Sequence, residues 1–168
     1  MTEPNLDPVV RRGRPADVER IAAFINQSRP QGQQVVAADV LARFGTVGFL
    51  LAEADGQLVG LLGWQVENLV ARITDFLIFP AQLTQTAGPV LLAAMEETAQ
   101  ELQCEAAILF APPAAPAQLL AFWEAFGYAL RQLDELPRAW REVAREANPG
   151  GDRVMLKQLR ADRVLRPI

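Results

Sequence analysis

The stretch from Ile73 to Phe110 restricts the possible folds more than any other part of the chain. It opens with an almost continuously apolar run that ends at Pro80, which predicts a strand buried on both faces, because proline cannot donate to a sheet. After a polar turn, apolar residues recur at helical spacing opposite an acidic face, which predicts a one-sided helix. The inward residues of that helix would be Leu91, Leu92, Met95, Ala99 and Leu102. Residues 106–110 are apolar again, so the predicted order is strand, turn, helix, strand.

The start of that helix is marked by a glycine and a proline. Gly88 lies just before it, and Pro89 suits the first helical position, where an N–H would have no partner inside the helix. At such a start, the backbone amides of the preceding loop converge with the positive end of the helix dipole. The sequence therefore indicates a turn before Pro89 that can hold an anion.

Composition excludes several classes of function. The chain has 168 residues and a net charge of −4, which suits one domain and argues against a nucleic-acid binder. It has one cysteine, Cys104, and no histidine, so histidine-based triads and zinc clusters are excluded and we expect no metal. No uncharged apolar run approaches the ~20 residues of a membrane span, and the first residues lack a signal-peptide core. We therefore expect a soluble cytoplasmic protein that binds neither nucleic acid nor membrane.

The residues before this stretch predict a strand, two helices and a hairpin. Val9 to Gly13 reads as a strand, and a helix should open near Pro15. A shorter helix is expected from Ala38 to Phe44, with Val40, Leu41 and Phe44 turned inward. Two β-like runs, residues 49–54 and 57–65, then meet at Asp55-Gly56, which is a strong hairpin signal.

The residues after it alternate between helix and strand. A helix should run through Trp123 and Phe126 and end at Gly127, and residues 128–133 and 153–159 should be strands. Between those strands, residues 134–147 predict a helical insertion with one apolar side, formed by Leu136, Trp140 and Val143. Residues 160–168 form a short, basic C-terminal tail.

Taken in order, these elements resemble the GNAT superfamily of N-acetyltransferases over nearly the whole chain. Glu53–Gly60 resembles the second hairpin of that family, Ile73–Pro80 its fourth strand, and Phe122–Tyr128 its closing aromatic segment. The resemblance implies an α/β (α+β) fold with a mixed central sheet of about six to seven strands, flanked by helices and splayed between the fourth and fifth strands. Residues 1–168 would form this single domain, including the helical insertion and the tail.

The resemblance also implies a donor site. In the family, acetyl-coenzyme A lies where the two strands splay apart, its pantetheine arm pairs with the fourth strand, and its pyrophosphate rests on the amides of a glycine-containing loop. This assigns Leu77 and Ile78 to the arm. The residues assigned to the pyrophosphate are Thr84, Gln85, Thr86, Ala87 and Gly88.

The loop departs from the family pattern of Arg/Gln-x-x-Gly-x-Gly/Ala. Counted without a gap from Pro80, Leu83 takes the Arg/Gln position, Thr86 the first glycine and Gly88 the second. A register shifted by two would match Gln85 and Gly88 but would put the helix out of step. The side chain of Thr86 crowds the approach that a glycine leaves open.

Proton transfer departs from the family pattern as well. Trp123 stands where many members carry a tyrosine that protonates the leaving thiolate, and an indole is not a useful acid. Tyr128 is expected to pack in the next strand. With no histidine in the chain, a carboxylate must accept the proton of the amine, and Asp75 and Glu67 are the candidates from the central-strand region. Each could instead be an ordinary structural carboxylate.

The sequence thus predicts an acetyl-CoA-dependent N-acyltransferase that acts by direct transfer on a small-molecule or peptide amine. The alternative is a non-catalytic GNAT-like module that binds a ligand or forms a homodimer. In that case the apolar side of the insertion at residues 134–147 would be the interface.

Overall fold

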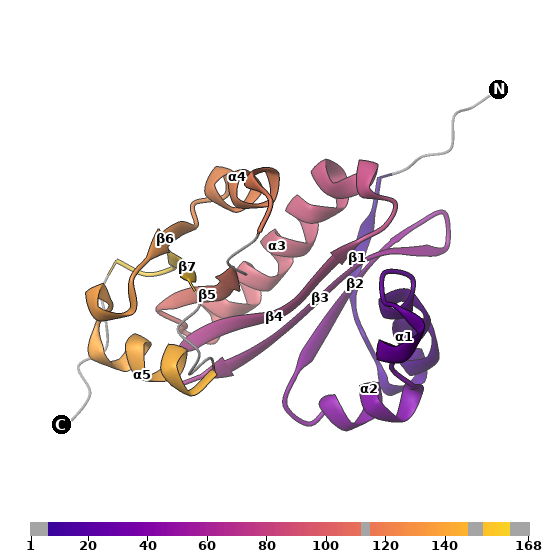
Figure 1. Ribbon diagram of the computed structural model, residues 1–168, viewed down its shortest axis with the longest axis horizontal. Helices are drawn as coiled ribbons and strands as arrows, with labels where there is room; N and C mark the ends of the chain where they lie inside the picture. Colours follow the sequence, from indigo (N-terminus) through magenta and orange to yellow (C-terminus); the bar gives the residue numbers. More distant parts are fainter. Residues whose placement is uncertain (1–6, 112–114, 148–152, 162–168) are drawn as a thin grey trace. The chain divides into compact units, whose positions relative to one another are not determined.

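The computed structural model describes residues 7–111, 115–147 and 153–161 (Figure 1). They divide into two compact parts: a first part within residues 7–65 and 74–95, and a second part formed by the described residues of 66–73 and 96–161. Two strands, β3 and β4, and one helix, α3, are continuous from one part into the other.

The strands are β1 (Val9–Arg12), β2 (Gly48–Ala54), β3 (Gln57–Glu67), β4 (Val70–Ile78), β5 (Ala106–Ala111), β6 (Ala129–Arg131) and β7 (Arg153–Gln158). The α-helices are α1 (Val18–Asn26), α2 (Ala37–Arg43), α3 (Thr84–Glu101), α4 (Ala117–Ala125) and α5 (Arg138–Ala147). Single 3₁₀ turns lie at η1 (Pro15–Asp17), η2 (Gln31–Gln33), η3 (Ala81–Leu83) and η4 (Leu133–Glu135). The seven strands form a mixed sheet in the order β1-β2-β3-β4-β5-β7-β6, in which β4 and β5 are parallel. This confirms the predicted fold class.

The hairpin of β2 and β3 forms as the sequence predicts. Asp55 and Gly56 have φ angles of 53° and 73°, and Ala54 pairs with Gln57 across the turn. Two successive positive φ values match the right-handed twist of the strands, which is why Asp-Gly marks this kind of turn. The next turn also has two positive φ values, 49° at Asn68 and 64° at Leu69. As a result β4 begins at Val70, three residues earlier than the sequence predicted.

Neighbouring residues of β3 show which helices cover each face of the first part. Leu61 is fully buried in a cluster with Ile21 of α1 and Val40 of α2. Gly60 faces the other way, since a Cβ added to it would lie 2.8 Å from the Leu91 side chain of α3. Successive residues of a strand point to opposite faces. Helices α1 and α2 therefore cover one face of β1–β3, and the first half of α3 covers the other (Figure 1).

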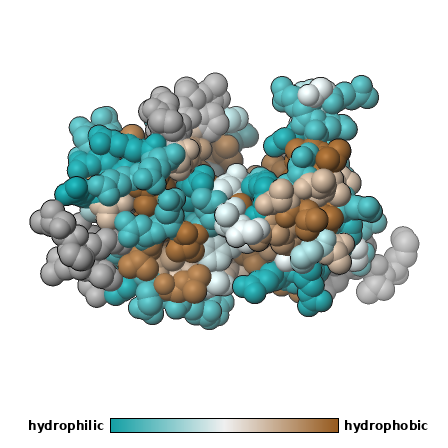
Figure 2. Space-filling view, turned by 90° about the horizontal axis from the view of Figure 1, so that it is seen from below, coloured by the Kyte–Doolittle hydropathy of each residue, from teal (hydrophilic) through white to brown (hydrophobic). Residues whose placement is uncertain are grey.

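One predicted core residue of α2 is at the surface. Val40 is 1% exposed and supplies the buried contact of this short helix, whereas Leu41 is 50% exposed. The next residue of a helix is turned by about 100°, so both side chains cannot face the sheet equally well. Val36, just before α2, is 62% exposed, and Figure 2 shows apolar side chains on the face that carries this helix. The prediction that Leu41 points inward is wrong.

The second part is built around β5, which pairs in parallel with the start of β4 and antiparallel with β7. Helix α5 packs on these strands: Trp140 is buried in one cluster with Val70, Ile108 and Val154. The predicted apolar side of the insertion is therefore confirmed, but it faces this part's own sheet. The argument that it forms a dimer interface is wrong, because its side chains are already covered.

The ends of two elements differ from prediction. Gly127 has a φ of 92°, as a residue just after a helix end often does, so the predicted end of α4 is confirmed. Strand β6 is only three residues long, because η4 replaces the end of the predicted strand. Leu102, expected inside α3, follows its last residue and is 52% exposed.

Candidate functional site

Strand β4 extends well beyond its pairing with β5. Paired positions join Val70–Arg72 to Ala106–Ile108, and β4 then continues to Ile78. From Thr74 onward its side chains are half-buried, so the expectation of a strand buried on both faces is wrong for this half. Leu77 packs against the cluster beneath α1 and α2. The side chains that alternate with Leu77, those of Phe76 and Ile78, belong to the opposite face of the strand.

Arg43, Thr74 and Asp75 form a compact polar group, which we call the Arg43–Asp75 clasp. The two guanidinium Nη atoms bind the two carboxylate oxygens, with Arg43 Nη1 3.2 Å from Asp75 Oδ1. Arg43 Nη2 also lies 3.3 Å from Thr74 Oγ1, and the Thr74 hydroxyl donates to Asp75 Oδ2 at 2.7 Å. The guanidinium lies over the ring of Phe49, 5.1 Å from its centroid. The clasp fixes the last residue of α2 to the middle of β4.

The clasp depends on the absence of a side chain at Gly63 of β3. A Cβ added there would overlap Asp75 Oδ2 and would lie 2.9 Å from Thr74 Oγ1. A glycine within an apolar strand often marks such a close approach, so Gly63 is a sequence signal for this group that the prediction did not use. Arg43 gave no signal, because it is separated from Asp75 by the whole of β2 and β3.

The two predicted catalytic acids have different surroundings. Asp75 accepts hydrogen bonds from Arg43 and Thr74, and its side chain is 13% exposed. Its carboxylate is therefore rigidly oriented. Glu67 is the last residue of β3 and is half-buried. Their catalytic roles stay predictions.

The turn between β4 and α3 is tighter than predicted. Residues Ala81–Leu83 form η3, and α3 begins directly after it, at Thr84. Pro89, which was predicted to open the helix, lies inside it, so the predicted helix start is wrong. The i→i+3 hydrogen bonds of the preceding turn let the helix begin before Pro89. A helix can contain a proline in its interior at the cost of one backbone hydrogen bond.

Two N–H groups and two threonine hydroxyls at the start of α3 form hydrogen bonds within the turn. The Leu83 N–H donates to Pro80 O at 3.0 Å, and the Thr84 N–H donates to Ala81 O. Thr84 Oγ1 donates to Ala81 O at 2.7 Å, and Thr86 Oγ1 donates to Leu83 O at 3.0 Å.

The residues assigned to the pyrophosphate differ in their accessibility. Gln85 and Thr86 are exposed, Thr84 is half-buried, and Ala87 and Gly88 are buried. Gly88 lies within the helix, so it does not open a loop. The segment before Gly88 is therefore a 3₁₀ turn followed directly by helix, and the assignment of Thr84–Gly88 to the pyrophosphate stays a prediction.

Charge also distinguishes this region. From Ile73 to Leu130 the sequence contains no lysine, arginine or histidine. The same stretch contains six carboxylates, at Asp75, Glu96, Glu97, Glu101, Glu105 and Glu124. Of these six, only Asp75 belongs to the first part, where it is paired with Arg43, and the other five belong to the second part.

In the second part, the aromatic residues near the end of α4 belong to the core. Trp123 is 2% exposed and Tyr128 is 1% exposed, and their rings meet edge to face at 5.2 Å. The Tyr128 hydroxyl donates to Glu96 Oε1 at 3.2 Å, and Lys157 Nζ lies 2.8 Å from the same oxygen. Burial, followed by the charge of Glu96, raises the pKa of Tyr128 well above its usual range. Tyr128 therefore packs in the core, as the sequence predicted, and is unsuited to donate a proton.

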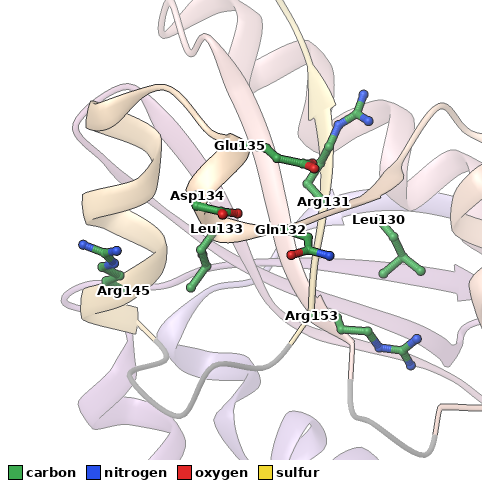
Figure 3. A pocket seen from close by; sticks show the side chains of 8 residues that line it. All are labelled: Leu130, Arg131, Gln132, Leu133, Asp134, Glu135, Arg145 and Arg153. Carbon is green, nitrogen blue, oxygen red and sulfur yellow. The ribbon is translucent and has the colours of Figure 1, made fainter.

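A surface hollow of about 670 Å³ lies beside β6, η4, α5 and β7 in the second part (Figure 3). Arg131, Arg145 and Arg153 line it together with Asp134 and Glu135. Figure 3 shows the three arginine side chains pointing in different directions, and all three are exposed. The hollow mixes both signs of charge and does not form a converging anion site.

Neither a metal cluster nor a membrane span is found in the described part of the chain. Within residues 7–111, 115–147 and 153–161, no three acidic or cysteine side chains are grouped so that they could hold a metal ion. No helix in these ranges is both long enough and apolar enough to cross a bilayer.

The fold defines a class of protein. Its mixed sheet contains the parallel pair β4 and β5, and helix α3 connects these two strands. Comparison with known proteins identifies the family. The sequence model of the acetyltransferase (GNAT) family matches residues 18–128. The chain belongs to this family, which confirms the resemblance seen in the sequence.

Solved structures share the fold at low sequence identity. N-acetylglutamate synthase from Neisseria gonorrhoeae, in complex with coenzyme A and N-acetyl-glutamate, is 20% identical with a TM-score of 0.67. The match covers 91% of this chain and 35% of that one, so this chain spans about a third of the synthase. A GNAT-family acetyltransferase from Staphylococcus aureus Mu50 is 14% identical with a TM-score of 0.69, covering 91% and 99% of the two chains.

A further structure was determined with the coenzyme. PaiA N-acetyltransferase from Thermoplasma acidophilum, in complex with coenzyme A, is 14% identical with a TM-score of 0.63, and the match covers 90% and 98% of the two chains. No curated protein sequence matches this chain.

Proposed function

We propose that this chain is an N-acyltransferase that moves an acyl group, acetyl in the simplest case, from a coenzyme A thioester to the amine of a small molecule or peptide. The carrying observation is the continuation of β4 through Ile78 beyond its pairing with β5 at Val70–Arg72. Family membership supports the same reaction, and so do the structural neighbours determined with coenzyme A.

The second half of β4 suits the pantetheine arm. An extended arm with amide groups can pair with strand backbone as another strand would. Residues Leu77 and Ile78, assigned to the arm from the sequence, lie at the end of this half and are half-buried. At the start of α3 the N–H groups of Leu83 and Thr84 bond within the turn, and Thr84, Gln85, Thr86, Ala87 and Gly88 stay the residues proposed for the pyrophosphate.

The chain's own groups would orient the reactants. When bound, the thioester supplies the acyl group. A C–N bond forms as the C–S bond breaks, the amine loses a proton, and the leaving thiolate takes up a proton and is released as a thiol. A backbone N–H near Ile78 would polarise the carbonyl. Asp75 or Glu67 would accept the amine proton, directly or through water.

The experiment is a panel of amines incubated with acetyl-CoA, in which thiol release and acylated product are both measured. Asp75→Asn and Glu67→Gln test the two acids, and Glu97→Gln, at an exposed position of α3, is the matched control. An acid that accepts the proton should lose about 10²-fold or more in kcat when it is replaced. Unchanged turnover in one variant would remove that residue from the mechanism.

The alternative is a module that binds the thioester without turnover. Binding of CoA, together with no product over the amine panel, would favour it. The insertion no longer supports this alternative, because Trp140 and its neighbours are buried within the second part.

A further inference from the structure

Arg72 is the last residue of β4 in the parallel pairing with β5, and it is an isolated cation in the sequence. Between Arg43 and Arg131 it is the only lysine or arginine. We propose that Arg72 determines acceptor specificity by binding a carboxylate of the substrate. The acceptor is then an amine that also carries a carboxylate, in the simplest case a free amino acid. This inference rests on the proposed function, because it concerns the acceptor of that reaction.

The guanidinium of Arg72 has no partner in the part of the chain that the structure describes. Its Nε is buried and makes no hydrogen bond there, and no carboxylate of residues 7–111, 115–147 or 153–161 forms an ion pair with it. The side chain as a whole is half-buried, so it is not sealed from solvent. Buried polar groups without a partner are costly and rare in folded proteins. Because the planar fork of a guanidinium matches the two oxygens of a carboxylate, a carboxylate is the ligand that would satisfy Arg72 best.

The pairing of the strands places Arg72 on the face of the second part that α5 covers. Arg72 pairs with Ile108 of β5. Ile108 is buried in one cluster with Trp140 of α5 and with Val70, which precedes Arg72 by two residues. Alternate residues of a strand share a face. The second part therefore carries a guanidinium on a face whose buried residues are apolar.

Glu67 lies on the same face, across the turn between β3 and β4. Glu67 and Val70 flank the two-residue turn at Asn68-Leu69, where both φ angles are positive, so their side chains share a face. Arg72 is then a diagonal neighbour of Glu67, and such neighbours lie about 7–8 Å apart, within reach of one small molecule. Among the described residues, Glu67 and Arg72 are not paired with each other.

These two opposite charges match the two charges of an amino acid. Arg72 would hold the carboxylate, and Glu67 would face the ammonium group. The ammonium gives one proton to Glu67, directly or through water, and the neutral amine attacks the thioester carbonyl. A C–N bond forms as the C–S bond breaks, and the second proton lost by the nitrogen is balanced by the proton that the leaving thiolate takes up. Of the two candidate bases, this arrangement favours Glu67 over Asp75, whose carboxylate is held by Arg43.

The test measures kcat and KM of the full chain for pairs of acceptors that differ only in the carboxylate. The pairs are the standard amino acids and their α-carboxamides, with acetyl-CoA as the donor. We expect at least one amino acid to be acylated with a kcat/KM about 10- to 100-fold above that of its carboxamide, mainly through KM, because hydrogen bonds to a charged group are strong.

Succinyl-CoA, used as a second donor, distinguishes the source of the carboxylate. If Arg72 binds the acceptor, succinyl-CoA should give no advantage over acetyl-CoA. A preference for succinyl-CoA, together with equal rates for acids and carboxamides, would place the carboxylate on the acyl group and would overturn the proposal.

Three variants identify the residue responsible. Arg72→Gln should lower kcat/KM for the amino acid to that of its carboxamide and leave the carboxamide unchanged. Arg72→Lys, which keeps the charge but loses the fork, should restore part of the preference. Arg138→Gln, at an exposed arginine of α5, is the matched control and should keep the full preference. Circular dichroism of each variant checks that it folds.

Other results would overturn the proposal. Equal rates for acids and carboxamides in the parent chain, or an equal loss for both in Arg72→Gln, would exclude recognition of a carboxylate by Arg72 while the proposed function stands. If no amine is acylated from either thioester, the proposal falls together with the proposed function.

Discussion

Replacing Gly63 by alanine tests the clasp most sharply. The new methyl group would overlap Asp75 Oδ2 and crowd Thr74 Oγ1 at 2.9 Å, so the carboxylate must move away from Arg43. Overpacking costs about 1–3 kcal/mol, and part of a half-buried ion pair is lost in addition. Alanine recovers some of this cost, because it loses less backbone entropy than glycine. The expected loss in the free energy of unfolding is about 2–3 kcal/mol.

The assay is urea unfolding followed by circular dichroism, supported by thermal melts. For a chain of this size the loss corresponds to a fall in Tm of about 4–12 °C. Gly45→Ala is the matched control, since a Cβ there meets nothing within 4 Å, and it should change stability by less than about 0.5 kcal/mol.

A double-mutant cycle isolates the cause. In an Asp75→Ala background the carboxylate is absent, so adding Gly63→Ala should cost less than about 1 kcal/mol. A Gly63→Ala variant as stable as the parent, or an equal cost in both backgrounds, would refute the account of the clasp.

Three further predictions concern stability and protonation. Hydrogen bonds from Arg11 hold the pKa of Asp17 at about 2, below its usual 3.8, so Asp17 stabilises the fold above about pH 4 and this contribution is lost as the pH falls toward 2. Asp17→Asn should lower the free energy of unfolding by about 1–2 kcal/mol at neutral pH. Below pH 4 the urea midpoint of the variant should fall less steeply with pH than that of the parent protein, and an equally steep fall would contradict this. Trp140→Ala should lose about 3–5 kcal/mol in urea unfolding, because its ring is 4% exposed in the core of the second part, whereas Arg138→Ala, at an exposed ion pair, should lose less than about 0.5 kcal/mol. Equal losses in the free energy of unfolding for Trp140→Ala and Arg138→Ala would contradict the burial of this side of α5. Tyr128→Phe should cost about 1 kcal/mol through its hydrogen bond to Glu96 and leave acetyl-CoA turnover unchanged, and a large loss of turnover would assign the hydroxyl a chemical role.

Local signals made much of the fold predictable. Asp55-Gly56 specified the β2–β3 hairpin, because both residues readily adopt the positive φ that a turn matching the twist of its strands requires here. Gly127 likewise specified the end of α4. The apolar spacing of Trp140 and Val143 predicted the buried side of α5, although it could not say what would cover that side.

The site was harder to predict, because its contacts join distant residues. Arg43 and Asp75 lie on elements separated by a hairpin, and nothing near either residue specifies the pairing. The start of α3 was misjudged because Gly88-Pro89 is a strong local signal for a helix start. The 3₁₀ turn at Ala81–Leu83 and its hydrogen bonds prevailed over that signal. Leu41 was misplaced because periodicity does not fix how a short helix is rotated, and Leu102 because periodicity does not show where a helix stops.

The central claim is that an acyl thioester lies along the second half of β4. Backbone amide NMR of the labelled chain during a titration with pantetheine tests this directly. The account predicts the largest shifts at Thr74–Phe79, with smaller changes at the start of α3. Shifts confined to residues 81–88, or to the hollow beside β6 and η4, would contradict it.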